Sequence, residues 1–324
     1  MLRRKLVGLG MVVAALVVGA GAQAQDAYPN KPVRWIVPFP AGGPTDTLSR
    51  ILTARLAEYW NQGVVVENKG GAAGAIGTDF AAKAAPDGYT LILGTQSTHG
   101  SNKIFYPNLP YDPITDFQPL SLIGTACMAL VTAPNVPANT PKEFVAWLKA
   151  QPSVAYASAA TGSSQHVAAE LMMKRSGIAA THVPYRGSAA AMPDLMSGRV
   201  AFMFDNLPSA LPQARAGKVK ALAQTCATRS PSAPDLPTME ESGFPDFAIE
   251  GWYGIFAPAR TPRPIVDKLS ADINRALREP ESMERWKTLG FDPIGSTPEA
   301  FAERQKADLA YWKRMIDDTG IKVE

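Results

Sequence analysis

Short apolar runs alternate along this chain with segments of helical periodicity. In the N-terminal part, the runs rich in β-branched and aromatic residues predict strands at Val33–Phe39, Val64–Asn68 and Tyr89–Gly94. The apolar residues that recur at helical spacing after the first run are Leu48, Ile51, Leu52, Leu56 and Trp60. Strands that alternate with helices are typical of βαβ units, so this pattern predicts an α/β fold with mainly parallel sheets.

A second alternating set follows the proline-rich stretch LPYDPITDFQPLSLIG at 109–124, which we interpret as a crossover between domains. Its predicted strands are Met128–Thr132, Val154–Ser158, Thr181–Tyr185, Val200–Asp205 and Val219–Thr225. One more strand, IEGWYGIFAPA, is expected to return and complete the first set, which has only three. The predicted closing helices are Pro262–Leu277, Ser282–Leu289 and Pro298–Asp317.

This order predicts two α/β lobes joined by two crossings. Lobe 1 would contain residues 25–125 plus 250–324, and lobe 2 residues 126–249. Ligands of open α/β sheets bind beyond the carboxyl ends of the strands, which here would face a cleft between the lobes. The loops that follow the strands are PFPAGGPTD, GTQSTHGSN, SAATGSSQH, PYRGSAA and FDNLPSA. Because these loops are rich in Gly, Ser, Thr and Asn, we expect a cleft lined by backbone N–H groups and hydroxyls.

The first 24 residues have the pattern of a cleaved export signal. Arg3, Arg4 and Lys5 precede an uncharged run that ends in the small-x-small site Ala22-Gln23-Ala24. The alternative, a membrane anchor, is disfavoured because the run is short of the ~20 residues of a span and rich in Gly and Ala. We expect an exported protein that is cleaved after Ala24.

Composition and charge then exclude several classes of protein. The chain has 324 residues, 46% hydrophobic and 19% charged, as an ordinary globular protein does. Loss of the signal lowers Lys+Arg from 32 to 29 against 29 Asp+Glu, so the mature formal charge is 29 − 29 = 0. Without a basic excess, no nucleic acid is expected as a partner. The three histidines and two cysteines have no metal-ligand or CxxC spacing, so no metal is expected, although a disulfide is possible.

Two strand-to-helix turns are candidate anion sites. In PFPAGGPTD, Gly42 and Gly43 give backbone freedom and the turn meets the first free N–H groups of a helix, where an anion can bind. Simple capping by Thr45 or Asp46 is the alternative, and the Asp46 carboxylate competes for the same N–H groups. The turn Thr161-Gly162-Ser163-Ser164 repeats this logic in the second lobe.

Other candidates carry weaker signals. His166 follows the second turn and is either a packing residue or a ligand contact, and Arg186 either pairs with a carboxylate or is a solvated loop cation. The glycines of GGAAGAIG do not form G-x-G-x-x-G, which argues against a dinucleotide. There is no G-x-S-x-G nucleophile elbow, which argues against a hydrolase. An exported hydrolase is kept only as the alternative class of protein.

Several motifs together resemble one family. They are YPNKPVRWIVPFPAGGPTDTLSR, DGYTLILGT, LPYDPITDFQPLSLIG, HVPYRGSAAAMPDLMSGRVAFMFDN, GKVKALAQT, LPTMEESGFPDF and GWYGIFAPARTP. In this order they are similar to the extracytoplasmic solute receptors of tripartite tricarboxylate transporters, often called Bug receptors, over the whole mature chain.

The resemblance implies a two-lobed periplasmic binding protein of type II, the Venus-flytrap architecture, with a mainly parallel sheet in each lobe. Such a receptor is a monomer without catalysis or cofactor that closes on a small organic carboxylate and delivers it to a membrane permease. Service to a signalling partner as a ligand sensor is a further alternative. The family's grip on a carboxylate, through backbone N–H groups and water, corresponds to the loops Pro38–Asp46 and Ser158–Ser164.

The resemblance also yields a set of expected ligand-binding residues. They are Phe39, Ala41, Gly42, Gly43, Thr45, Asp46, Thr95, Gln96, Ser158, Thr161, Gly162, Ser163, Ser164, His166, Tyr185, Arg186 and Asp205. His99 joins them as a candidate for selectivity, and Asp46 is expected to orient its turn. In the type II topology the strand that begins near Cys127 runs beside the one that ends near Cys226, so a disulfide between them is a hypothesis.

Overall fold

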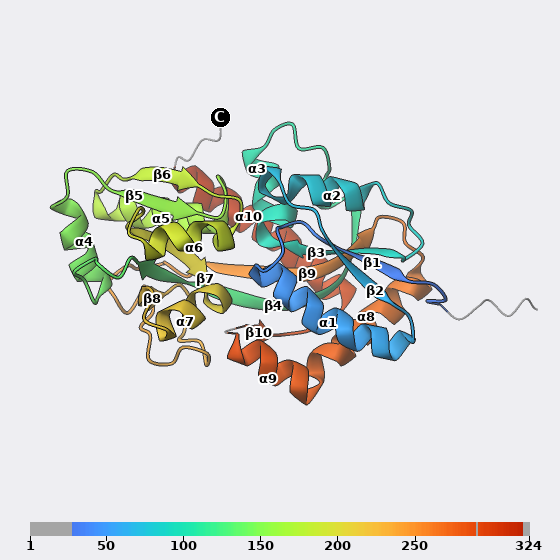
Figure 1. Ribbon diagram of the computed structural model, residues 1–324. Coiled ribbons are helices and arrows are strands. Elements are labelled where there is room, and N and C mark those ends of the chain that lie inside the picture. Colours follow the sequence, from blue (N-terminus) through green and yellow to red (C-terminus); the bar gives the residue numbers. More distant parts are fainter. Residues whose placement is uncertain (1–27, 290, 320–324) are drawn as a thin grey trace, which may run out of the picture.

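The computed structural model describes residues 28–289 and 291–319 of the chain (Figure 1). Its strands are β1 (Val33–Val37), β2 (Val64–Asn68), β3 (Thr90–Thr95), β4 (Phe117–Thr132), β5 (Ala155–Ser158), β6 (Thr181–Pro184), β7 (Phe202–Asn206), β8 (Lys220–Gln224), β9 (Glu250–Pro258) and β10 (Asp292–Pro293). Its α-helices are α1 (Pro44–Trp60), α2 (Ala75–Ala82), α3 (Asn102–Phe105), α4 (Pro141–Lys149), α5 (Ser164–Ser176), α6 (Ser188–Met196), α7 (Leu207–Arg215), α8 (Arg263–Arg278), α9 (Pro280–Thr288) and α10 (Pro298–Thr319). Two short turns, η1 (Ala72–Gly74) and the π-helical η2 (Ser97–Ser101), complete the set.

Two groups of three parallel strands lie at opposite ends of one strand order, β2-β1-β3-β9-β4-β7-β5-β6. Strands β2, β1 and β3 form the centre of lobe 1, and β7, β5 and β6 form the centre of lobe 2 (Figure 1). The antiparallel strands β9 and β4 lie between the two groups. The predicted two-lobed α/β fold is confirmed.

Strand β4 belongs to both lobes. Its residues from Phe117 to Cys127 pair with β9, and those from Met128 to Thr132 pair with β7 and β8. The stretch 109–124, interpreted from the sequence as a crossover, therefore contains the first half of a long strand. Its register shifts after Pro119 and again after Leu122, and these irregularities hide the alternation of a regular strand.

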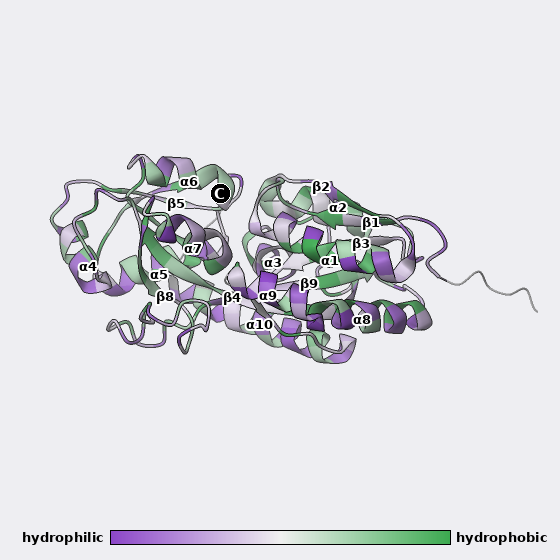
Figure 2. Ribbon diagram, turned by 60° about the horizontal axis from the view of Figure 1, so that its bottom comes forward, coloured by the Kyte–Doolittle hydropathy of each residue, from purple (hydrophilic) through white to green (hydrophobic). Residues whose placement is uncertain are grey.

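Each lobe has its own hydrophobic core. In lobe 1, Leu48, Leu52 and Leu56 on one face of α1 pack with Trp35 of β1, as the helical spacing predicted. Complete burial of one such side chain stabilises the fold by about 1.5–3 kcal/mol. Figure 2 shows the amphipathic pattern on α8, whose buried residues include Leu269.

Helix α10 connects the lobes a third time. At its N-terminal end, Phe301 packs in a lobe 1 cluster, and the Gln305 Nε2 atom donates to the carbonyl oxygens of His99 and Pro113, both at 2.9 Å. Further along the same helix, Trp312 and Met315 join the core of lobe 2. The sequence predicted two crossings and assigned residues 250–324 to lobe 1, whereas here α10 spans both cores.

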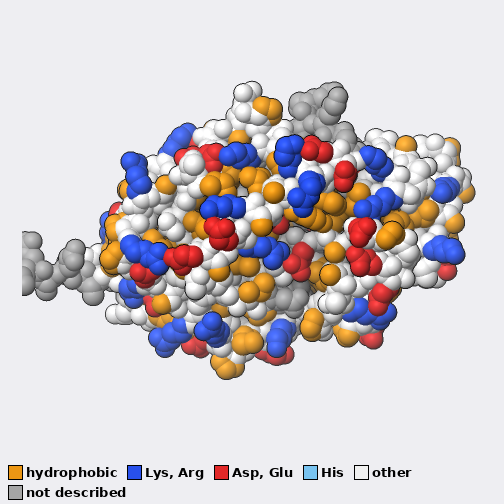
Figure 3. All heavy atoms as spheres, turned by 180° about the vertical axis from the view of Figure 1, so that it is seen from behind, with side chains coloured by type: hydrophobic (Ala, Val, Ile, Leu, Met, Phe, Trp, Pro, Cys, Tyr) orange, Lys and Arg blue, Asp and Glu red, His pale blue; other side chains and the backbone are white. Residues whose placement is uncertain are grey.

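A disulfide joins Cys127 of β4 to Cys226, just after β8, with the two Cα atoms 5.2 Å apart. On the surface seen in Figure 3, cationic and anionic side chains are interspersed, without a field of one sign. No helix within residues 28–289 and 291–319 has the length and apolar character needed to cross a membrane. The predicted export signal lies outside the described residues.

Candidate functional site

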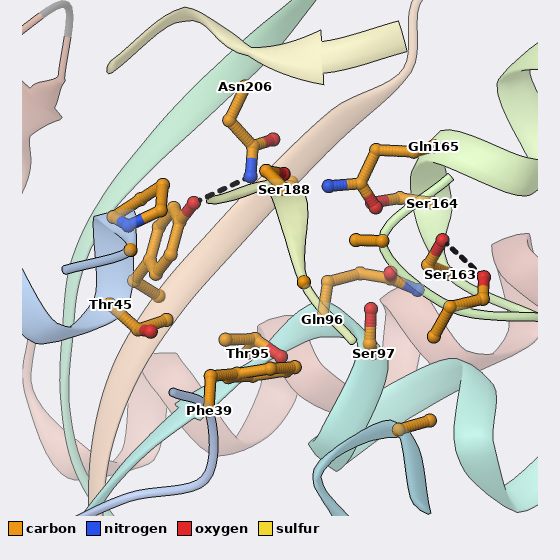
Figure 4. A pocket seen from close by; sticks show the side chains of 18 of the residues that line it. Phe39, Thr45, Thr95, Gln96, Ser97, Ser163, Ser164, Gln165, Ser188 and Asn206 are labelled. Atoms are coloured by element: carbon orange, nitrogen blue, oxygen red, sulfur yellow. Dashed lines mark hydrogen bonds between the residues drawn. The ribbon is translucent and has the colours of Figure 1, made fainter. Parts of the chain in front are cut away.

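A cleft with about 770 Å³ of empty space, part of it open to solvent, lies between the lobes (Figure 4). Its lining residues from lobe 1 are Phe39, Pro40, Gly43, Pro44, Thr45, Ala73, Thr95, Gln96, Ser97, Asn102, Gly251, Trp252 and Tyr253. Those from lobe 2 are Ala159, Ala160, Ser163, Ser164, Gln165, Arg186, Gly187, Ser188, Ala189 and Asn206. Because both lobes supply walls, relative movement of the lobes would open and close the cleft.

The N-terminal ends of four helices meet at this cleft. The lining includes Pro44–Thr45 at the start of α1, Ser164–Gln165 at the start of α5, Ser188–Ala189 at the start of α6, and Asn206 as the N-cap of α7. The first N–H groups of a helix have no intrahelical partner, and the helix dipole places partial positive charge there. Among the described lining residues none is Asp or Glu, and Arg186 is cationic. The cleft is therefore suited to an anion.

The Asp46 carboxylate, in the first turn of α1, has partners of its own. Its Oδ2 atom accepts from the backbone N–H of Gly42 and from Nε of Arg50, both at 3.0 Å. Burial alone would raise the pKa of Asp46, but the hydrogen bonds from Arg50 and Gly42 outweigh it and lower the pKa. Gly43, the N-cap of α1, offers no side-chain cap. Asp46 thus stabilises the turn, as expected, and engages an N–H group that precedes the helix.

The turn before α5 is held from within lobe 2. Ser163, the N-cap, accepts from the N–H of His166 at 3.3 Å and donates to the carbonyl oxygen of Ala160 at 2.7 Å. The His166 Nδ1 atom accepts from the N–H of Gly162 at 3.1 Å. Burial, with a smaller effect of His182, lowers the pKa of His166 to about 3, which keeps the ring neutral and able to accept this bond. His166 therefore supports the turn from behind the lining.

One serine–histidine pair lies near the cleft without forming part of its wall. The Ser158 hydroxyl is within 2.7 Å of His182 Nε2, and it also donates to the carbonyl oxygen of Ala160 at 2.9 Å. Ser158 is fully buried, and neither residue lines the cleft. Because a nucleophile must reach the substrate, this pair does not favour the hydrolase alternative. Within residues 28–289 and 291–319, no group of His, Cys, Asp and Glu is arranged to hold a metal ion.

The expected ligand-binding residues fall into two groups. Those on the lining are Phe39, Gly43, Thr45, Thr95, Gln96, Ser163, Ser164 and Arg186. Those off the lining are Ala41, Gly42, Asp46, Ser158, Thr161, Gly162, His166, Tyr185 and Asp205. Several of the second group bond within their own lobe; the Tyr185 hydroxyl, for example, donates to Asp194 Oδ2 at 2.7 Å. His99 is fully buried and stacks on Phe256, with the ring centroids 4.0 Å apart.

Asp205 lies one layer behind the wall. It is fully buried and accepts from the Ser188 hydroxyl at 2.5 Å and the N–H of Asn206 at 2.9 Å. Burial raises its pKa to about 6. Asn206 then reaches the cleft, where its Nδ2 donates to the Tyr253 hydroxyl at 2.8 Å, as Figure 4 shows. The buried carboxyl thus positions two lining residues.

Some lining residues were not singled out from the sequence. Five of them lie within the loops expected to form the walls, so the composition of these loops was the sequence feature that indicated them. They are Ser97, Asn102, Gln165, Ser188 and Asn206. Trp252 and Tyr253 are different. They belong to β9, which reads in the sequence as an ordinary core strand, and only the return of β9 to lobe 1 brings them to the cleft.

Comparisons with known proteins agree with this geometry. The family described as "Tripartite tricarboxylate transporter family receptor" matches residues 48–321. Protein BugT of Bordetella pertussis is 36% identical over 323 residues, which cover 99% of each chain. Rpa4515 of R. palustris, solved with adipate, is 34% identical with a TM-score of 0.89 and covers 91% of this chain and 99% of its own. MatC of Rhodopseudomonas palustris, solved with bound malate, is 34% identical with a TM-score of 0.84 and covers 89% of this chain and 100% of its own. This chain therefore belongs to the family of tripartite tricarboxylate transporter receptors, as its motifs predicted.

Proposed function

We propose that this protein is a periplasmic receptor that captures a small organic carboxylate between its lobes and delivers it to the permease of a tripartite tricarboxylate transporter. The observation that carries the proposal is the meeting of four helix N-termini at a cleft without an acidic lining residue among those described. The adipate and malate bound by two relatives are carboxylates, which supports the same ligand class.

In this proposal, the first N–H groups of α1 and α5 hold the shared carboxylate from opposite lobes. The hydroxyls of Thr45, Ser163 and Ser164 stand beside them. Arg186 is exposed at the cleft and would attract a second anionic group on the ligand. The family is one of solute receptors rather than enzymes, so the ligand is expected to leave unchanged.

A thermal-shift screen of organic acids tests the proposal. The protein is taken from a periplasmic extract, and its intact mass also tests cleavage after Ala24. At a hundredfold excess over Kd a ligand adds about 2.7 kcal/mol, which for this size corresponds to a melting shift of about 5 °C. NMR of the bound acid after incubation should recover it unchanged. If no organic acid shifts the melting temperature, the proposal is contradicted, and a hydrolysed ligand would favour the hydrolase alternative.

A further inference from the structure

Gln96 is a buried lining residue whose carboxamide has no hydrogen-bond partner within the described part of the chain. It follows the last residue of β3 and precedes η2. Its side chain is 1% exposed, yet neither Nε2 nor Oε1 is hydrogen-bonded. This does not depend on which way the amide is turned, because both of its atoms are free.

Such an arrangement is unusual for a buried amide. Removing a carboxamide from water without replacing its hydrogen bonds is unfavourable, and most buried polar atoms are therefore paired. Among the other amides, Gln305 Nε2 donates to the carbonyl oxygens of His99 and Pro113. On the cleft wall, Asn206 and Asn102 each have a free Oδ1, but the Nδ2 atom of each is bonded, whereas Gln96 has no bond at either atom. The free amide of Gln96 is thus the polar group on the cleft wall that most requires an outside partner.

The position of Gln96 limits what that partner can be. Figure 4 shows its amide extending from lobe 1 toward Ser163 and Ser164 of lobe 2, so it lies at the junction of the two walls. On its other side, Gly100 lies next to Nε2 without bonding to it, so a partner has to come from the cleft that Gln96 lines. The partner must therefore be a small group that enters with the ligand.

The chemistry of the amide narrows the choice further. A carboxamide presents two N–H donors and one carbonyl acceptor. A carboxylate offers only acceptors and would leave Oε1 facing negative charge, while an ammonium offers only donors and would leave the N–H groups unpaired. A hydroxyl group both donates and accepts, and it is small.

We propose that Gln96 is a specificity-determining residue that binds a hydroxyl group on the body of the bound carboxylate, so that the protein prefers hydroxycarboxylates. This inference rests on the proposed function and goes beyond it. The helix N-termini hold the carboxylate common to all ligands, and Gln96 distinguishes a hydroxy acid from the same acid without its hydroxyl.

Calorimetric titration of the mature protein with matched acids tests the inference. The pairs are L-malate and succinate, citrate and tricarballylate, and 4-hydroxybenzoate and benzoate. In a pair that binds, the hydroxy acid should bind about tenfold tighter than the acid without a hydroxyl. The reason is that the second acid leaves the buried amide of Gln96 without a hydrogen-bond partner, which weakens its binding by about that factor. In Gln96→Met, which keeps the length of the side chain, the preference should fall to within about threefold, mostly through weaker binding of the hydroxy acid.

Gln118→Met is the matched control. The Gln118 Nε2 atom donates to the carbonyl oxygen of Pro119, away from the cleft, so this variant should keep the wild-type preference. Equal binding of both members of each pair by the wild-type protein would overturn the inference while leaving a carboxylate receptor intact, and this comparison needs no variant to fold. A preference that survives in Gln96→Met would overturn the role of Gln96. If none of the acids binds, the proposed function fails, and the inference fails with it.

Discussion

The Tyr106 hydroxyl of lobe 1 donates a 3.0 Å hydrogen bond to the carbonyl oxygen of Thr161 in lobe 2. Beside it, the Ser101 hydroxyl donates to the carbonyl oxygen of Gly162 at 3.2 Å. We call these four residues the interlobe clasp. Thr161 and Gly162 immediately precede Ser163, the N-cap of α5 at the cleft. The turn that would face the ligand is therefore also the turn that joins the lobes.

Removing one bond of the clasp should weaken ligand binding without weakening the fold. Tyr106→Phe deletes a hydrogen bond worth about 0.5–1.5 kcal/mol, so the affinity for an organic acid should fall roughly twofold to tenfold. We expect the clasp to form only when the lobes close, so the melting temperature of the ligand-free protein should hardly change. Titration calorimetry measures the affinity, and a thermal scan measures the melting temperature. The control is Tyr89→Phe, which removes a hydroxyl that bonds to Asn30 within lobe 1. An equal loss of affinity in this control would refute the role of the clasp in ligand binding.

A methyl group at Gly162 should prevent closure. Gly162 has φ +77°, and a Cβ there would lie 2.6 Å from the ring of Phe105, which the lobe 1 segment contributes to the core cluster of lobe 2. Gly177→Ala is a matched control, since Gly177 has φ +62° but nothing within 4 Å of its Cβ position. Both variants should lose about 1 kcal/mol of stability through the positive φ. Only Gly162→Ala should also lose affinity for the ligand by more than about tenfold, because a clash must be relieved before the lobes meet. Equal affinities in the two variants would contradict this reading.

The stacked rings of His166 and His182 should make the fold sensitive to acid. Their centroids lie 3.9 Å apart, and burial lowers their pKa values to about 3 and about 4. Unfolded histidine titrates near 6.5, so below that pH the unfolded chain binds more protons and stability is lost as pH falls toward 4.

Comparison with His182→Gln isolates this effect. Asp205 and Asp308, whose pKa values burial raises to about 6, oppose it, because their contribution to stability is lost as pH rises through about 6. The two carboxyls are common to both proteins, so the variant should show the shallower fall in unfolding free energy from pH 6.5 to 4.5. Urea titrations at several pH values measure both slopes, and parallel slopes would disprove the prediction.

The disulfide should contribute substantially to stability. It links residues 99 positions apart, and closing a loop of that length restricts the unfolded chain enough to stabilise the fold by about 2–5 kcal/mol. Reductant should therefore lower the urea midpoint of the wild-type protein. Replacing both Cys127 and Cys226 by Ala should lower it similarly and remove the response to reductant. Two free thiols found by mass spectrometry in protein isolated without reductant would reject the bond.

The sequence predicted the local elements better than the way in which they connect the lobes. The strand Val64–Asn68 has the predicted bounds, and the helix predicted at Pro262–Leu277 is displaced by one residue, because their periodicity is regular. Strand β4 was missed before Met128, since Pro119 and two register shifts interrupt its pattern. Helix α10 was predicted from its periodicity, but an apolar face does not determine which core it packs against. The packing of Trp312 in the core of lobe 2 could therefore not be predicted.

The site was predictable as a set of loops and less so as a set of side chains. Loop composition indicated the walls, whereas side-chain direction depends on partners far along the chain. Gly43 illustrates this. The sequence analysis expected both Gly42 and Gly43 to give the turn its backbone freedom, yet the φ of Gly43 is −82° and the nearest atom to a Cβ there, Pro40 O, is 3.7 Å away. Gly42, at φ +82°, is the glycine that the turn requires.

The central claim is that helix N-termini from both lobes hold the negative charge of a carboxylate. The most direct test compares the acid that gives the largest melting shift with its own amide, both titrated calorimetrically into the mature wild-type protein. The amide keeps the shape and removes the charge, so the account predicts at least a hundredfold weaker binding, about 2.7 kcal/mol. Equal affinity for the acid and the amide would contradict it.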